Sequence, residues 1–180
     1  VYIVNADENA IALGLESGDY DHAATASIVN AKRWSSNDDL VFNANYARGM
    51  GSTNELQFNM ANPVMSDLRV RQAIAYAIDR DFIINELHQG QTLEQLGGIH
   101  PSSPFYNADV ERYDVDLDKA RALLADAGHA DGLELNIDYI PGPDEQQRNV
   151  AEYIARALEP VGITVTVRDS ASLPAWAGIF

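Results

Sequence analysis

The chain has 180 residues, a hydrophobic share of 46%, and 27 acidic against 12 basic side chains, for a formal net charge of −15. A phosphate backbone or an anionic membrane face would be repelled by most of this surface, so nucleic acid is disfavoured as a partner. The sequence contains no cysteine, which excludes disulfides, a thiolate nucleophile and cysteine-ligated metal sites. No apolar run approaches the ~18 residues that a membrane-spanning helix needs.

The first third of the chain predicts a helix among short strands. The helix begins at Asp7, a good N-cap residue, and carries apolar side chains at helical spacing. Residues 47–52 have the composition of a turn. The predicted strands span residues 1–4, 20–24, 39–43 and 55–60.

Three helices and one long loop follow. The helices are expected to begin after Asp67, Asp79 and Asp116, because each aspartate precedes an apolar stripe with a period of about 3.6 residues. Residues 90–110, rich in glycine and proline, show little periodicity and predict a loop of the kind that is usually functional. The shift in composition at residues 59–63 marks the best domain boundary.

The tail has the clearest architecture. Apolar and polar side chains alternate over residues 133–139 and again over 163–167, which is the pattern of strands. Between them, Asp144 is expected to cap a helix with one apolar face. A strand, a helix and a strand within so short a stretch predict a βαβ unit with parallel strands.

No motif predicts catalysis or metal binding. Asp114, Asp116 and Asp118 resemble the start of a calcium loop, but Lys119 and Ala125 stand where that loop needs glycine and a bidentate glutamate. The four histidines lack metal-ligand spacing, and neither a dinucleotide fingerprint nor a nucleophile elbow is present. The sequence therefore predicts no catalytic residue, no metal site and no cofactor.

Both ends of the sequence indicate a piece of a longer protein. The chain starts with valine at a predicted strand, without a signal-peptide pattern, and closes on the apolar residues 175–180. Termini are usually polar or frayed, so we expect further sequence on either side, with any signal peptide outside this chain.

Several segments occur together in a characteristic order. They are residues 15–21 (LESGDYD), 56–59 (LQFN), 66–80 (SDLRVRQAIAYAIDR), 113–116 (YDVD), 119–128 (KARALLADAG) and 158–165 (LEPVGITV). This series resembles the extracellular solute-binding proteins of family five, the dipeptide-, oligopeptide- and nickel-binding components of ABC importers. The resemblance spans nearly the whole chain.

The resemblance implies a fragment of a type II periplasmic-binding-protein fold, an α/β fold with a mixed sheet, flanking helices and the parallel βαβ unit at 133–167. Two lobes of this fold close over a ligand like a hinged clamp. Residues 1–57 would form part of the first lobe, 58–61 the hinge region, and 62–180 most of the second lobe without its C-terminal part.

The resemblance also implies a function. The whole protein would capture a peptide, nickel chelate, opine or oligosaccharide and deliver it to the membrane permease of an ABC transporter. It would lie in the periplasm or outside the cytoplasm, free or as a membrane-anchored lipoprotein.

Candidate ligand-binding residues follow partly from the resemblance, because in the dipeptide binder of the family the loop after the strand equivalent to 133–139 contacts the ligand. Here that loop is shorter and lacks the arginine–tyrosine pair of the dipeptide binder. Ligands of open α/β sheets lie beyond the carboxyl ends of strands, and a helix N-terminus presents N–H groups there. The candidates are Phe58, Asn59, Ile140, Pro141, Gly142, Pro143 and Asp144.

Two other function classes remain open at this stage. A ligand-sensing domain of a regulator or receptor shares the lobe architecture and would carry a DNA-binding or signalling segment elsewhere. A small α/β hydrolase would need a nucleophile or a metal cluster, which the sequence does not offer.

Overall fold

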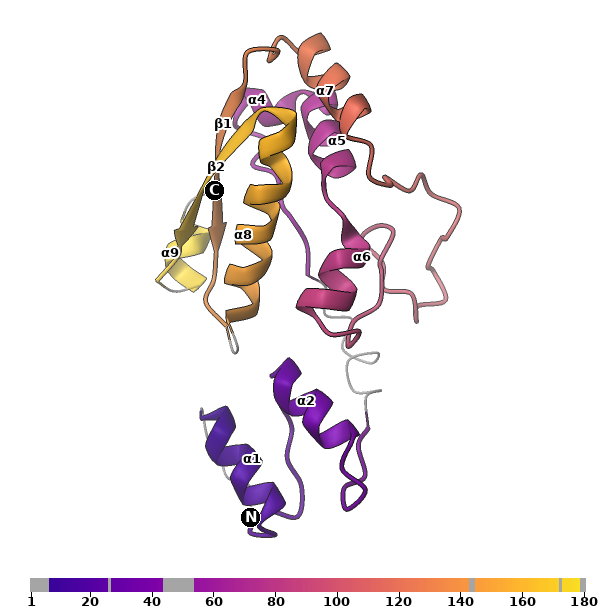
Figure 1. The fold of residues 1–180 in the computed structure, drawn as a ribbon, viewed down its shortest axis with the longest axis vertical. Helices are drawn as coiled ribbons and strands as arrows, with labels where there is room; N and C mark the ends of the chain where they lie inside the picture. The colour runs from indigo at the N-terminus through magenta and orange to yellow at the C-terminus, as the bar shows by residue number, and fades with distance from the viewer. Residues whose placement is uncertain (1–6, 26, 44–53, 143–144, 172, 179–180) are drawn as a thin grey trace.

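The computed structural model describes residues 7–25, 27–43, 54–142, 145–171 and 173–178 (Figure 1). The helices and strands, in chain order, are α1 (Glu8–Glu16), α2 (Ile28–Ser35), α4 (Pro63–Ser66), α5 (Leu68–Ala77), α6 (Arg80–Phe82), the π-helix η1 (Ile83–Leu87), α7 (Leu117–Asp126), β1 (Leu133–Tyr139), α8 (Gln146–Leu158), the 3-10 helix η3 (Glu159–Val161), β2 (Ile163–Asp169) and α9 (Leu173–Ala177). Within these ranges, no helix combines the length and the apolar character needed to cross a bilayer.

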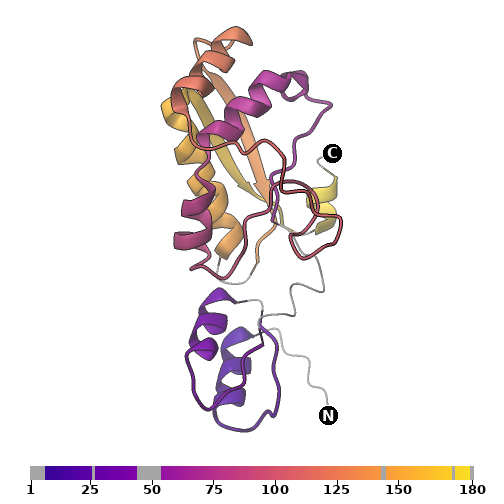
Figure 2. The same cartoon turned by 90° about the vertical axis from the view of Figure 1, so that its right-hand side faces the viewer.

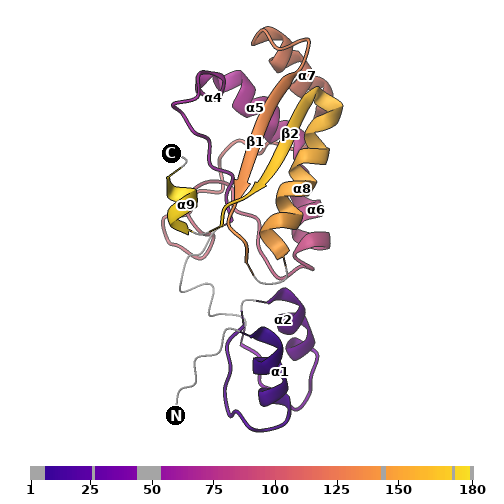
Figure 3. The same cartoon turned by 90° about the vertical axis from the view of Figure 1, so that its left-hand side faces the viewer.

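The predicted βαβ unit is confirmed. β1 and β2 are parallel neighbours in one sheet, and their register runs from the pair Leu133–Ile163 to the pair Tyr139–Asp169. Helix α8 connects the two strands and packs against both of them, as Figure 3 shows. The carboxyl ends of the strands therefore meet at one edge of the sheet.

The two faces of this sheet differ as the alternating pattern predicts. Leu133, Leu135, Ile137 and Val165 lie against the hydrophobic core. On the opposite face, the side chains of Glu134, Asn136, Thr164 and Thr166 are exposed. The charged pair Asp138 and Arg168 ends this polar face, with 2.6 Å between Oδ2 and Nη2.

The core lies between the sheet and helices α5, α7 and α8 (Figure 2). Ala73 of α5 and Ala120 of α7 are both completely buried, so small side chains let these two helices approach closely. The buried members of the core are Met65, Val70, Ala73, Ile74, Tyr76, Ala77, Ile78, Ala120, Leu124, Ile154, Leu158, Val161 and Ile163.

Aspartate caps begin four helices where the sequence predicts them. The carboxylates of Asp7, Asp67, Asp79 and Asp116 each accept a hydrogen bond from a backbone N–H in the first turn. Such caps satisfy N–H groups that the helix itself leaves without partners. At α8 the predicted cap Asp144 lies outside the described residues, and Glu145 stands at the N-cap position without a side-chain hydrogen bond.

Helices α1 and α2 lie side by side at one end of the molecule in all three views (Figures 1 to 3). The Thr25 hydroxyl donates to the Glu8 carboxylate over 2.5 Å, and the Asn30 amide donates to the Glu8 carbonyl over 3.1 Å. Trp34 is buried here, outside the main core. The division into lobes at 1–57, 58–61 and 62–180 stays a prediction.

Three of the four strands predicted in the first third are wrong, and the fourth, at 1–4, lies outside the described residues. Residues 20–24, 39–43 and 55–60 form no strand. The chain instead turns at residues 37–40, where the N–H of Asp39 donates to the Asn37 side chain over 2.9 Å and the N–H of Leu40 donates to the Asn37 carbonyl over 3.1 Å. A helix that the sequence analysis missed, α2, begins at the N-cap Ser27.

Candidate ligand-binding site

The carboxyl edge of the sheet is the place where the predicted ligand-binding loop leaves β1. The hydrogen bonding between β1 and β2 continues one residue beyond the last strand pair, because the N–H of Ser170 donates to the Tyr139 carbonyl over 2.9 Å. Ile140 and Gly142 are half-buried, and Pro141 is exposed. Pro143 and Asp144 lie outside the described residues.

Gly142 lies against the first turn of α8. A Cβ atom built on Gly142 would lie 2.4 Å from Oε1 of Gln147, so the glycine leaves the space that the carboxamide occupies. Because Gln147 is exposed, this contact places a hydrogen-bond donor and acceptor next to the predicted loop.

The N-terminus of α8 faces the same loop. Glu145 has the left-handed φ of 53°, and its side chain caps no N–H of the helix. Arg148, one turn into α8, pairs with Glu152 over 2.9 Å and with Glu145 over 3.7 Å. These carboxylates raise the pKa of Arg148, chiefly through the hydrogen bond to Glu152. The thirteen-residue helix thus directs the positive end of its dipole toward this edge.

Ser170 is a residue of this edge that the sequence analysis missed. Its side chain is 5% exposed, and its Oγ has no hydrogen-bond partner among the described residues. Buried hydroxyls are usually hydrogen-bonded, so an unpaired one next to a strand end is a candidate ligand contact. A single serine after a strand carries no signal in the sequence that would separate it from other serines.

The other two candidates, Phe58 and Asn59, make contacts of a different kind. Phe58 packs against the margin of the core. The side-chain oxygen of Asn59 accepts the N–H of Ala61 over 2.9 Å, and its carbonyl accepts the N–H of Asn62 over 3.0 Å. Asn59 therefore closes a turn before α4, and its role toward a ligand stays untested.

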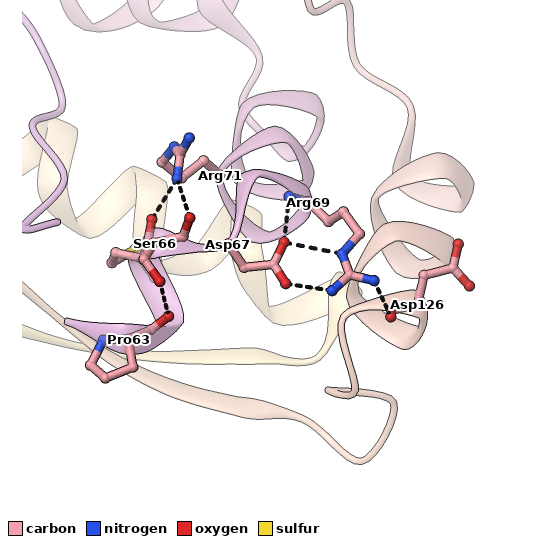
Figure 4. A network of polar contacts seen from close by, with 7 residues as sticks. Pro63, Ser66, Asp67, Arg69, Arg71 and Asp126 are labelled. Carbon is pink, nitrogen blue, oxygen red and sulfur yellow. Dashed lines mark hydrogen bonds and ion pairs between the residues drawn. The ribbon is translucent and has the colours of Figure 1, made fainter. Parts of the chain in front are cut away.

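Arg69 and Arg71 hold helix ends together, as Figure 4 shows. Arg69 forms a bidentate pair with Asp67, with 3.0 Å from Nε to Oδ1 and 2.6 Å from Nη2 to Oδ2, and it donates to the carbonyl of Asp126 over 2.6 Å. Arg71 donates to the carbonyls of Met65 and Ser66. The hydrogen bond from Arg69 lowers the pKa of Asp67 to about 2. These residues therefore join α4, α5 and α7.

A pocket with a cavity volume of about 220 Å³ lies between α6 and the chain before α7. It was not predicted from the sequence, because its walls come from segments far apart in the chain. The lining residues are Ile78, Asp79, Arg80, Asp81, Glu94, Arg112, Tyr113, Asp114 and Val115.

The aspartates that resemble the start of a calcium loop have other partners. Asp116 caps α7 by accepting the N–H of Lys119 over 2.8 Å. Asp114 pairs with Arg112 over 2.5 Å, and Asp118 with Arg121 over 2.6 Å. Within the described ranges, no three histidine, aspartate or glutamate side chains gather as metal ligands would.

Comparison with known proteins gives relatives for this sequence. The chain is 32% identical over 115 residues to the dipeptide-binding protein of Escherichia coli (strain K12), which covers 62% of this chain and 22% of that protein. It is 29% identical over 111 residues to heme-binding protein A of Haemophilus influenzae, covering 60% of this chain and 20% of that protein. The chain thus spans about a fifth of the length of these two relatives.

A solved structure shares the fold over almost the whole chain. The ABC transporter substrate-binding protein CtaP of Listeria monocytogenes superposes with a TM-score of 0.76 at 20% identity, covering 98% of this chain and 35% of that one. The fold is therefore part of a type II periplasmic-binding-protein fold, as predicted. The family model of the bacterial extracellular solute-binding proteins, family 5 middle, matches residues 1–176. With nearly every residue inside that match and the same fold in a solved relative, this chain belongs to the bacterial extracellular solute-binding proteins of family 5.

Proposed function

We propose that the protein to which this chain belongs is the substrate-binding component of an ABC importer, which captures a peptide or a similar small solute by lobe closure. The match to the family over residues 1–176 is the observation that carries this proposal. Residues 1–57 would belong to the first lobe, 58–61 to the hinge region and 62–180 to the second lobe. The solute would pass to a membrane permease, and the protein would lie in the periplasm or outside the cell, with or without a lipid anchor.

The proposed binding surface of this chain is the carboxyl edge of the sheet. Its members would be the predicted residues Phe58, Asn59, Ile140, Pro141, Gly142, Pro143 and Asp144, together with Gln147 and Ser170. The unpaired Ser170 hydroxyl and the Gln147 carboxamide support this choice, because both could replace water around a polar solute. The α8 N-terminus would favour a carboxylate at this edge.

These groups fit the backbone amides and the terminal carboxylate of a short peptide. They would act only by hydrogen bonding and electrostatics, so the proposed function includes no covalent step. Burial between two lobes would supply most of the affinity, since small-ligand sites typically bury ~70–90% of the ligand surface.

Mass spectrometry of the full-length protein, purified without added ligand, would identify the bound solute. Isothermal titration with that solute then tests the edge. Ser170→Ala removes one hydroxyl, and the loss of about 1 kcal/mol expected for a hydrogen bond weakens binding roughly fivefold. Gly142→Ala displaces the Gln147 carboxamide and should weaken binding as well.

Arg121→Ala is the matched control, because Arg121 lies on α7 and pairs with Asp118. If Ser170→Ala and Gly142→Ala both bound the solute as tightly as the parent protein does, the binding site would not lie at this edge. The absence of any co-purified or titratable peptide, chelate, opine or oligosaccharide would contradict the transport function itself.

A further inference from the structure

The chain between η1 and α7 runs mostly outside the core. No residue from 91 to 112 belongs to the hydrophobic core or packs against it. We call residues 91–116 the connecting segment; in Figure 1 it loops out on the right-hand side. The segment includes most of the loop that the composition of residues 90–110 predicts.

Polar contacts hold the two ends of the connecting segment against α6. Nη1 of Arg112 lies 2.7 Å from Oε2 of Glu94, and Nη2 of Arg112 lies 3.5 Å from Oδ1 of Asp81. Nη1 of Arg80 donates to the Tyr113 carbonyl over 2.7 Å. Between these ends the chain forms turns, since the N–H of Ser103 donates to the His100 carbonyl over 2.9 Å and the N–H of Tyr106 to the Ser103 carbonyl over 3.1 Å.

Large apolar side chains of this segment point away from the core. They are from 40% exposed at Val110 to 80% exposed at Phe105, and the full set is Leu93, Ile99, Phe105, Val110 and Val115. A single exposed apolar side chain on a protein surface is ordinary, but a concentration of them marks an interaction surface. The connecting segment therefore has a defined course and an apolar surface without a partner in the described residues.

The length of the relatives indicates which partner covers this surface. This chain spans about a fifth of the two relatives described above, and it shares its fold with 35% of CtaP. Most of the polypeptide in such proteins therefore lies outside the matched part. A partner on the same polypeptide is present at a high effective concentration. A second copy is a poorer partner, because the net charge of −15 on this part alone favours the monomer.

We propose that the connecting segment is an interface within the full-length protein, where Leu93, Ile99 and Phe105 pack against an apolar surface formed by polypeptide outside residues 1–180. The segment would then join this chain to the remainder of its own protein. The proposal rests on membership of the family and on the exposed side chains, and it does not depend on which solute the protein binds.

Thiol labelling of the full-length protein tests whether Phe105 is covered. Residues 1–180 contain no cysteine, so Phe105→Cys introduces the one thiol of this part, and mass spectrometry of its peptide follows the reaction with a maleimide. Asp118→Cys is the matched control, because the Asp118 side chain is 96% exposed and aspartate is rarely buried. In the native protein we expect labelling at Phe105→Cys to be at least ~tenfold slower than at Asp118→Cys, and we expect equal rates in urea.

Unfolding of the full-length protein gives a second readout. Phe105→Ala and Ile99→Ala should each lower the midpoint of urea unfolding, because a covered apolar side chain loses its contacts on truncation. Asp118→Ala should leave the midpoint unchanged. If Phe105→Cys fails to fold, Ile99→Cys supplies the labelled position in its place.

Three results would overturn the proposal. Equal labelling rates at Phe105→Cys and Asp118→Cys in the native monomer would mean that the surface is left open for another protein. Protection of Phe105→Cys that disappears on dilution, with a matching fall in the mass measured by light scattering, would assign the surface to a second copy. Unchanged urea midpoints in both alanine variants would show that no apolar surface covers the segment.

Discussion

Replacement of Leu158 by alanine should destabilise the whole second half of the chain. Leu158 ends α8 and is 1% exposed, inside the core that joins α5, α7 and the sheet. The substitution removes three buried carbon atoms, which at ~0.8 kcal/mol each gives roughly 2.4 kcal/mol of lost transfer free energy. The cavity left behind raises the expected loss to about 2–5 kcal/mol.

Urea unfolding followed by circular dichroism measures this loss. A domain stability of about 5–15 kcal/mol makes the change a large part of the total, so the midpoint should fall clearly while the slope stays the same. Leu13→Ala on α1 is the control, because Leu13 is 64% exposed and should change stability by no more than about 0.5 kcal/mol. Equal, small losses in the two variants would refute the placement of Leu158 at the centre of the core.

Asp67→Asn should flatten the acid end of the stability profile, because the pKa of Asp67 is lowered from 3.8 to about 2, chiefly by its hydrogen bond to Arg69. The ionised Asp67 stabilises the folded chain fully above pH 3.8, and this stabilisation is lost as the pH falls through about 2. If urea unfolding showed the same fall in stability at acid pH in the variant as in the parent, the reasoning would be wrong. The parent should lose thermal stability as the pH falls below 6.5, because burial lowers the pKa of His88 and the unfolded chain then takes up a proton that the folded chain does not. The variant His88→Leu should not show this loss. His22→Leu, at an exposed position, should leave that pH dependence unchanged, and equal behaviour of the two variants in melting experiments would argue against a buried neutral His88. The 180-residue chain alone should bind the solute of the full-length protein far more weakly than the full-length protein does, and comparable affinities in isothermal titration would mean that the essential site lies within these residues.

Local signals predicted the parts of the fold that depend on neighbouring residues. The aspartates at positions 7, 67, 79 and 116 begin helices because capping needs only the next few N–H groups. Alternation over 133–139 and 163–167 predicted both the strands and their buried face, since the period of a strand is visible in the sequence itself.

The sequence analysis was wrong where a segment's structure depends on contacts with distant parts of the chain. Residues 20–24, 39–43 and 55–60 have strand-like composition, but a strand needs a second strand to satisfy its backbone. Helix α2 was missed because Ile28, Val29 and Trp34 are residue types that favour strands. In the structure the helix buries Trp34, and this packing outweighs the local preference.

At the candidate site, sequence reasoning reached the loop but not its polar contacts. The approach of Gly142 to Gln147 and the burial of Ser170 depend on how α8 and β2 pack, which no local pattern encodes. The same holds for the ion pair between Arg112 and Glu94, because only the fold brings together two residues that are eighteen positions apart in the sequence.

The two-stranded sheet has a consequence for how copies of this chain behave in solution. In the described part of the chain, β1 and β2 each have one side without a neighbouring strand, and such a row of backbone donors and acceptors can pair with another extended chain. The net charge of −15 opposes this pairing, because like-charged copies repel over roughly 10 Å at 0.1 M salt. Colloidal stability of the isolated chain therefore depends on its acidity, and concentrated salt removes the barrier that keeps the strand edges of neighbouring copies apart.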